Sequence, residues 1–480
     1  MRDLCKLGLG LFTLLASISP VSVRAQSSTT AAGNALTSFR SNRNVSRKST
    51  LNPPILDQAI AGYWEGVIAH HGTELRINVE FKNDPSGLSA TIDVPDFYIL
   101  GYKLSKVTAN GPQVHFELPL GAAPDVFEGT LKDQGIEGKY SGRFYAEVPT
   151  TSFFRLWREH RDAGRYSRAE VSFASGSARL AGTLFVPTRP GRHPAIVMFH
   201  GSGPQTRESY LRFFADLFAR RGIATLIYDK RGTGASSGEI WYRTGDNFDQ
   251  LVSDALAGVQ MLRGRSDINP KKIGVWGLSQ GGWLAPMAAA RDEDIAFLVV
   301  VSGGGVTPGE QELFDDEVKL RDLHFSEEQI GRALDLLRQA DNVIRGREPL
   351  DKFLVSREAA QKEPWFVHLD RYPAKLPKED PIWESASNGM DFDPRPLWEK
   401  TKRPVLAIFG DQDKSTPALE SANRIELALK QGGNTDYEIR IFPRANHGLW
   451  ITPADESSDW RRPAPQWLDV MLSWLRKRVG

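Results

Sequence analysis

The 480-residue sequence has a single cysteine, Cys5, which lies in an N-terminal stretch typical of a secretory signal. If residues 1–25 are removed on export, the remaining chain has no cysteine, which excludes disulfide bonds, a cysteine nucleophile and thiolate metal ligands. The chain also has almost no net charge, because 60 Lys and Arg residues balance 59 Asp and Glu residues to give +1. No broad positive field is therefore available to attract nucleic acid or anionic lipid.

The N-terminal apolar run is short. It covers residues 7–18 after Arg2 and Lys6, about a dozen residues where a membrane-spanning helix needs roughly 20. We therefore expect a signal peptide over residues 1–25, an exported protein that is periplasmic or secreted, and no integral membrane segment after cleavage. An uncleaved anchor is the alternative. Residues 26–55, rich in Ser, Thr, Asn and Arg, predict a flexible linker.

Two folded regions follow. Residues 56–160 contain short alternating segments separated by turn residues, which predict an all-β domain, either a small sandwich or a barrel. Across residues 166–480, apolar strands alternate with amphipathic helices, which predicts an α/β domain with a parallel sheet. This alternation is interrupted by residues 306–402, which read as helices and loops and predict a cap insertion.

The pattern Gly-x-Ser-x-Gly occurs twice, at residues 277–281 around Ser279 and at residues 234–238 around Ser236. A nucleophilic serine at a strand-to-helix turn needs a strand directly before it and a helix directly after it. Only Ser279 has this context, between KKIGVW and WLAPMAAA, whereas Ser236 follows a turn and precedes a segment that is not helical. The sequence therefore favours Ser279 as a nucleophile, with helix capping as the alternative role.

A serine nucleophile needs a base, and the base needs an acid that orients it. Downstream of Ser279, Asp411 and Asp413 follow one predicted strand, and His447 follows the next. The carboxyl ends of parallel strands share one sheet edge, so these residues can meet Ser279, in the chain order serine, aspartate, histidine.

From about Tyr166 to Gly480, these motifs resemble the α/β-hydrolase superfamily, in its secreted serine esterase and prolyl-oligopeptidase-like branch. The resemblance implies a mostly parallel eight-stranded sheet and assigns the acid role to Asp413, through the pattern Gly-x-x-Asp at residues 410–413. It implies that the backbone N–H groups of Ser202 and Gln280 form the oxyanion hole, with His200 bracing the first loop. The turn DKRGTGAS, residues 229–236, resembles a family turn that shapes the site wall, and we assign it no chemistry.

Together these features predict a serine hydrolase that cleaves small-molecule carboxylic esters through an acyl-enzyme, with Ser279, Asp413 and His447 as the triad. The mechanism needs no cofactor and no metal. A serine peptidase or aminopeptidase with the same triad is one alternative, and a non-catalytic binding protein on the same scaffold is another. The sequence indicates no oligomeric state. Aromatic residues of the insertion either line an acyl pocket or form the core of the cap: Trp365, Phe366, Trp383 and Trp398.

Overall fold

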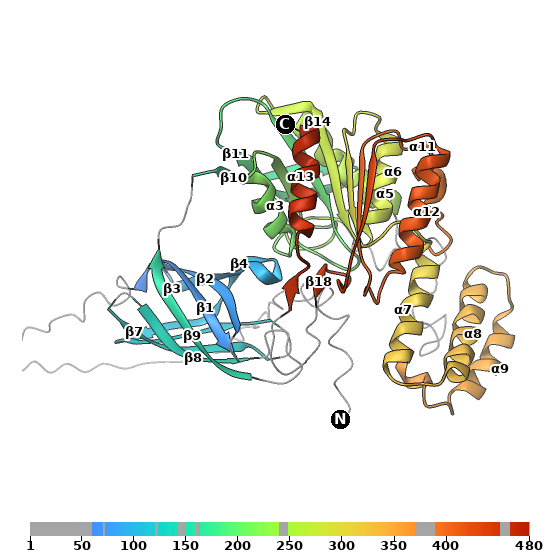
Figure 1. The fold of residues 1–480 in the computed structure, drawn as a ribbon, viewed down its shortest axis with the longest axis horizontal. Helices are drawn as coiled ribbons and strands as arrows, with labels where there is room; N and C mark the ends of the chain where they lie inside the picture. The colour runs from blue at the N-terminus through green and yellow to red at the C-terminus, as the bar shows by residue number, and fades with distance from the viewer. Residues whose placement is uncertain are drawn as a thin grey trace, which may run out of the picture.

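The structure is a computed structural model that describes residues 60–70, 73–120, 123–133, 135–142, 150–159, 164–239, 248–369, 389–451 and 461–479. The predicted signal peptide and linker lie outside these residues. Figure 1 shows an N-terminal barrel of strands beside a larger α/β part, with two helices projecting from the far side of the α/β part. None of the described helices is both long and apolar enough to cross a membrane.

The N-terminal barrel is one antiparallel sheet of nine strands in the order β4-β3-β2-β1-β9-β8-β7-β6-β5. Its edge strands β4 and β5 are consecutive in the chain, and β5 also contacts β3, so the sheet curls until its ends meet. Inward-facing residues alternate along the strands and form a core that includes Trp64, Phe116 and Phe127. Of the two expected architectures, this strand order supports the barrel. The strands are β1 (Gly62–His70), β2 (Thr73–Asp84), β3 (Gly87–Val94), β4 (Ile99–Lys103), β5 (Ser105–Asn110), β6 (Gln113–Leu118), β7 (Asp125–Lys132), β8 (Gly135–Gly142) and β9 (Thr150–Glu159).

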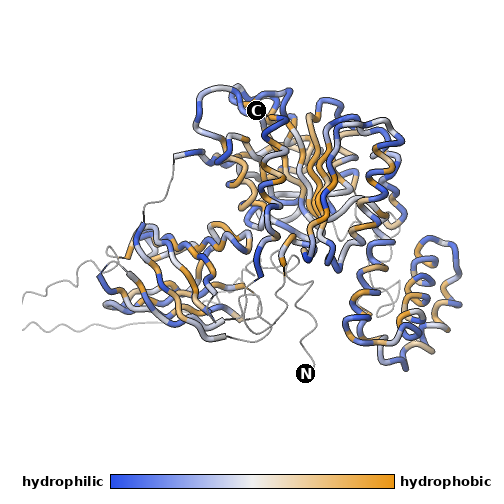
Figure 2. Tube along the Cα trace, viewed as in Figure 1, coloured by the Kyte–Doolittle hydropathy of each residue, from blue (hydrophilic) through white to orange (hydrophobic). Residues whose placement is uncertain are grey.

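The α/β part is built on an eight-stranded sheet in the order β10-β11-β13-β12-β14-β15-β16-β17. The pairs from β13 through β17 are parallel, and the β10–β11 hairpin joins that block through an antiparallel pair. Figure 2 shows that the central strands are continuously apolar, as expected for parallel strands covered on both faces. The strands are β10 (Tyr166–Ser175), β11 (Ala178–Pro187), β12 (His193–Phe199), β13 (Ala224–Tyr228), β14 (Ile268–Leu278), β15 (Leu298–Val301), β16 (Val405–Gly410) and β17 (Tyr437–Phe442).

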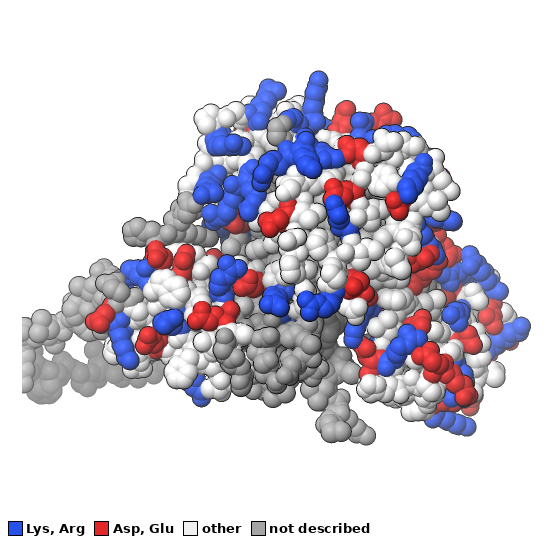
Figure 3. All heavy atoms as spheres, in the orientation of Figure 1, with Lys and Arg blue, Asp and Glu red and all other residues white. Residues whose placement is uncertain are grey.

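Helices cover both faces of this sheet and create two separate cores. Helices α5, α6, α11 and α12 pack on one face, and α3 and α13 pack on the other. On the face seen in Figure 3, basic side chains gather over the part of the α/β region where α13 lies, and acidic and basic side chains are mixed over the cap helices. The helices are α3 (Leu211–Ala219), α5 (Phe248–Arg263), α6 (Gly281–Arg291), α11 (Arg395–Lys400), α12 (Ala418–Gln431) and α13 (Trp467–Val479).

The structure also contains a small sheet that the sequence analysis did not predict. A third, two-stranded sheet pairs β18 (Trp450–Ile451) with β19 (Arg462–Pro463), directly after the loop that contains His447. Strands of two residues are too short to produce an alternating hydrophobic pattern, so no pattern in the sequence marks them.

The insertion between β15 and β16 is helical, as expected, and has its own core. It contains α7 (Pro308–Asp322), α8 (Glu327–Ile344), α9 (Leu350–Ala360) and the short helix η3 (Phe366–His368). Helices α7 and α8 both begin with a capping box, in which a Thr or Ser side chain and a Glu or Gln three residues later satisfy each other's backbone N–H groups. In Figure 1, α8 and α9 stand away from the sheet, and α7 connects them to it.

Tyr98 of the N-terminal barrel packs into the core of the α/β part. Tyr98 follows the short helix η2 (Pro95–Phe97), has a left-handed φ of 57° and is only 2% exposed. Its ring stacks on Trp450 with centroids 4.8 Å apart, and its hydroxyl accepts a hydrogen bond of 2.9 Å from Trp467 Nε1. Trp450 Nε1 donates in return to the Asp96 carbonyl at 3.1 Å. The barrel is therefore anchored in the core beneath α3 and α13.

Candidate active site

Ser279 lies on a sharp turn between β14 and α6 and has a left-handed φ of 56°. Its N–H donates to the Val301 carbonyl at 2.9 Å, and its carbonyl accepts from the Gly282 N–H at 2.8 Å. The turn leaves no room for side chains on its flanks, because a Cβ on Gly277 would lie 2.3 Å from the Gly281 carbonyl oxygen. The strand, turn and helix that distinguish Ser279 in the sequence are therefore present around it.

Ser236, the second serine in the same pattern, has a different environment. Its Oγ donates to the Asp229 carbonyl at 2.7 Å and accepts from the Ala181 N–H at 2.9 Å, and the residue is 8% exposed. The hydroxyl thus closes the turn through Asp229 and holds it to β11 through Ala181.

Asp413 and His447 lie in contact, as their positions in the sequence suggest. His447 Nδ1 donates to Asp413 Oδ2 at 2.8 Å, while Asp413 Oδ1 accepts from the backbone N–H groups of Ser415 and Thr416, each at 2.8 Å. The Asp413 side chain is fully buried, and that of His447 is 18% exposed. Asp411, the other candidate acid, is exposed.

The sheet brings these residues to one edge. Strands β14, β15, β16 and β17 are parallel neighbours, and Ser279, Asp413 and His447 follow the carboxyl ends of β14, β16 and β17. The histidine loop crosses close to the end of β16, because a Cβ on Gly410 would lie 2.1 Å from the Ala445 carbonyl oxygen.

The loop after β12 contains Ser202, one of the two residues expected to supply an oxyanion donor. The Gly201 N–H donates to the Tyr210 hydroxyl at 3.1 Å, and Gln205 Nε2 donates to the Ser202 carbonyl at 2.8 Å. Gln280, which carries the second expected donor, is the N-cap residue of α6 and is 1% exposed.

His200 anchors the start of the same loop. Its Nε2 donates to the Tyr228 carbonyl at 2.6 Å, and the side chain is buried. Burial, assisted by the charge of Lys230 and opposed by the Tyr228 hydrogen bond, lowers the pKa of His200 to about 3. A neutral imidazole that uses its N–H in this way fits the bracing role expected for His200.

The cap helix α7 contributes an acid that the sequence analysis missed. Burial acts to lower the pKa of His447, but the charge and hydrogen bond of Asp413 and the charge of Asp315 outweigh it, so the pKa lies above its usual 6.5. Asp315 belongs to α7, more than 130 residues before His447, and no local motif marks it. Only the docking of the cap reveals this interaction.

The aromatic residues of the insertion mostly belong to hydrophobic cores. Trp365 is 1% exposed within the core of the cap, and Phe366 packs against that core. Trp398 packs beneath the sheet and donates from Nε1 to the Gly304 carbonyl at 2.7 Å. Trp383 lies outside the described residues.

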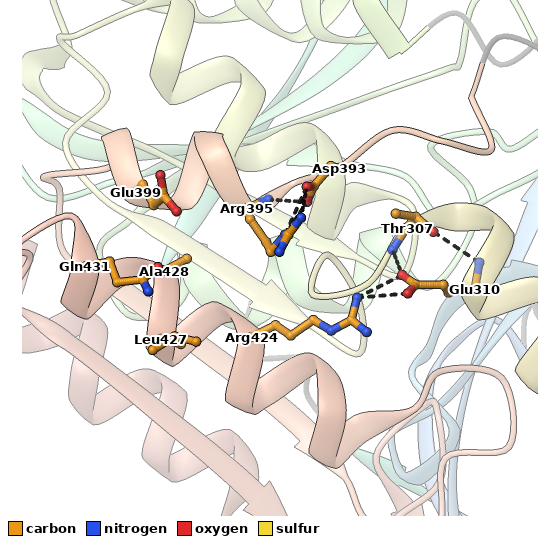
Figure 4. Close-up of a pocket in the computed structure, with 9 residues that line it drawn as sticks. All are labelled: Thr307, Glu310, Asp393, Arg395, Glu399, Arg424, Leu427, Ala428 and Gln431. Atoms are coloured by element: carbon orange, nitrogen blue, oxygen red, sulfur yellow. Dashed lines mark hydrogen bonds and ion pairs between the residues drawn. The ribbon is translucent and has the colours of Figure 1, made fainter.

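A polar pocket lies where the cap meets α11 and α12, and none of the triad candidates lines it (Figure 4). Arg424 pairs there with Glu310 at 2.9 Å, and Arg395 pairs with Asp393 at 2.6 Å. Since Glu310 is in the first turn of α7, the first of these pairs holds the base of the cap to α12.

Comparison with known proteins identifies the family of this chain. The family model described as "Alpha/beta hydrolase family" matches residues 196–460, more than half of the chain. The chain belongs to the alpha/beta hydrolase family. The parallel strands β13 to β17 and the strand-to-helix turn at Ser279 lie in the matched region of this hydrolase.

Relatives of this hydrolase include esterases. It is 25% identical over 350 residues to the esterase EstD of Thermotoga maritima, an alignment covering 69% of this chain and 74% of EstD. It is 32% identical over 130 residues to the quorum-quenching protein AidA of Acinetobacter baumannii, covering 27% of this chain and 42% of AidA. Among solved structures, the Pyrococcus furiosus esterase Pf2001 matches with 18% identity and a TM-score of 0.43, covering 66% of this chain and 92% of that one.

The raised pKa of His447 predicts the pH dependence of activity. Only neutral His447 can accept a proton, so kcat/KM for an ester should fall as the pH drops through a midpoint above 6.5. Asp315→Asn removes a charge that raises this pKa and should move the midpoint to lower pH. Glu317→Gln, which removes a charge paired with Arg321 on the same helix, is the control and should leave the profile in place. An unchanged midpoint in Asp315→Asn would contradict the prediction.

Proposed function

We propose that this hydrolase cleaves carboxylic esters of small molecules through a Ser279–His447–Asp413 triad and an acyl-enzyme intermediate. The observation that carries the proposal is the 2.8 Å hydrogen bond between His447 Nδ1 and buried Asp413, at the same sheet edge as the strained turn at Ser279. The similarity to EstD, an esterase by name, supports the reaction class.

In this mechanism Ser279 Oγ attacks the ester carbonyl while His447 Nε2 takes its proton. Asp413 keeps the remaining proton on Nδ1, which leaves Nε2 as the base, and stabilises the imidazolium that forms. The N–H groups of Ser202 and Gln280 hold the negative oxygen of the tetrahedral intermediate. His447 returns the proton to the departing alkoxide, and water then cleaves the acyl-enzyme by the same steps in reverse.

Replacing the two pattern serines separately tests the nucleophile. Ser279→Ala should lower kcat for an aryl butyrate by on the order of 10⁴-fold or more, as loss of a triad member does. Ser236→Ala is the matched control, because its hydroxyl holds a turn, and it should keep most of the activity. Activity of Ser279→Ala near that of the unaltered protein would overturn the mechanism.

Esters are the proposed substrates rather than peptides, as in the serine esterases of the branch that the sequence resembles. An ester's alkoxide leaves without the well-placed proton donation that an amine requires. The described N-terminal part is one curled sheet rather than a propeller of separate four-stranded blades, the domain that commonly precedes the hydrolase domain in peptidases of this branch. A helical cap also suits a compact substrate held away from water.

We expect kcat/KM for aryl esters of short to medium acyl chains to exceed that for aminoacyl or prolyl anilides by at least about tenfold, a barrier difference of roughly 1.4 kcal/mol. Purified protein tested on both substrate series provides the measurement. Efficient release of aniline with weak action on butyrate esters would favour the aminopeptidase alternative.

We also propose that the protein is exported and that residues 1–25 and 26–55 are its signal peptide and linker, ahead of domains at 56–160 and 166–480. Mass spectrometry of protein recovered from the periplasm or the medium should then give an N-terminus at Gln26. Recovery only from cytoplasm, with Met1 or Arg2 at the N-terminus, would contradict export.

A further inference from the structure

Lys230 is a buried cation that contacts both sides of the proposed oxyanion hole. It lies in the turn after β13 and is 1% exposed. Its Nζ donates to the carbonyl oxygens of Gly201 at 2.8 Å and Gly203 at 3.1 Å, and to Gln280 Oε1 at 2.8 Å. One ammonium thus joins the loop after β12 to the residue that follows Ser279.

The contact with Gly201 fixes the direction of the proposed donor on Ser202. In a planar trans peptide the C=O and the following N–H point in opposite directions. Because the Gly201 carbonyl points at Lys230, the Ser202 N–H of the same peptide points away from Lys230. Rotation of this peptide would break a buried hydrogen bond to a charged group and remove one acceptor of the Lys230 ammonium.

The neighbouring peptides are restrained in the same way. The Gly203 carbonyl also accepts from Lys230, and the Ser202 carbonyl accepts from Gln205 Nε2. Three consecutive carbonyls of the loop are therefore bound to buried side chains. A hydrogen bond to a cation further polarises the peptide that accepts it, which strengthens the donor at its other end.

Lys230 also donates to the side-chain oxygen of Gln280. The backbone N–H of Gln280 is the second proposed oxyanion donor. Lysine suits this position because its ammonium directs three donors tetrahedrally from one point, while the planar guanidinium of arginine does not. The backbone N–H groups of Ser202 and Gln280 need not contact Lys230 themselves, but the directions in which they point depend on the groups that Lys230 binds.

We propose that Lys230 is the positioning residue of the oxyanion hole, setting the direction of the Ser202 N–H and tying it to Gln280. This inference rests on the proposed function, because it assumes that these two N–H groups bind the oxyanion. It extends that function to a turn for which the sequence suggested only a shaping role.

The test compares Lys230→Met with Arg231→Met, each assayed on an aryl butyrate. Arg231 is the next residue of the same turn and is also buried, but its side chain binds Asp254 and Ser175. Endpoint labelling of Ser279 with a fluorophosphonate counts competent sites, so that kcat refers to folded protein. A trifluoromethyl ketone, which forms a tetrahedral alkoxide on the serine, reports on oxyanion binding.

For Lys230→Met we expect kcat per labelled site to fall on the order of 10²-fold, as when one oxyanion donor is lost, with KM changed by less than about threefold. Affinity for the trifluoromethyl ketone should fall by the same factor as kcat/KM. Arg231→Met should lower thermal stability and leave kcat per labelled site within about twofold.

Unchanged kcat and ketone affinity in Lys230→Met, or equal losses in both variants, would overturn the proposal. If Lys230→Met fails to fold, Gln280→Met takes its place: it removes one acceptor of Lys230 but keeps the backbone N–H, and kcat and ketone affinity should fall together by roughly tenfold. No effect in that variant would equally overturn it.

If unaltered protein neither hydrolyses esters nor labels at Ser279, the proposed function itself is wrong, and this inference falls with it.

Discussion

The position of Ser279 depends on close backbone packing: the turn at Ser279 and the loop after β15 touch at glycines, with no side chains between them. A Cβ on Gly303 would lie 2.2 Å from the Ser279 carbonyl oxygen, and a Cβ on Gly304 would lie 2.2 Å from that of Gly282. The loop after β15 therefore packs directly against the turn at Ser279. The loop after β15 is also bound to the loop that contains Asp413, since the Ser302 carbonyl accepts a hydrogen bond from Thr416 Oγ1 at 3.1 Å. Close backbone packing thus fixes the serine relative to Asp413 across the intervening strand.

The N-terminal barrel takes part in the same support. Trp450, which stacks on Tyr98 of the barrel, follows His447 by three residues, and its carbonyl accepts from the Asn446 N–H at 2.9 Å. The loop that contains His447 is consequently held before the histidine by the end of β16, at Ala445, and after it by the barrel, at Trp450. A domain far from Ser279 in the sequence thereby restrains the loop of the proposed base.

The elements that the sequence predicted well are those with a local signal. Strand and helix periods flank Ser279, and the resemblance to the family pattern Gly-x-x-Asp favours Asp413 over Asp411, so both could be proposed without a structure. Lys230 and Asp315 could not, because the residues with which they interact lie 27 or more positions away along the chain. Lys230 lies in a turn that the sequence analysis singled out, but most lysines are exposed, so the sequence alone did not suggest that this one is buried. Its burial against three acceptors is visible only in the structure.

The charges around the site match the charges that the proposed ester cleavage would create. In the proposed transition state His447 becomes positive, and it is faced by Asp413 and by Asp315 of the cap. The ester oxygen becomes negative at N–H groups whose peptides are oriented by Lys230. Because these groups are held in place before substrate arrives, little reorganisation is needed as charge develops, which is the main way that enzymes stabilise such states. In the proposed mechanism the cap therefore contributes the charge of Asp315 that stabilises the positive His447, and the Glu310–Arg424 ion pair holds the base of the cap to α12.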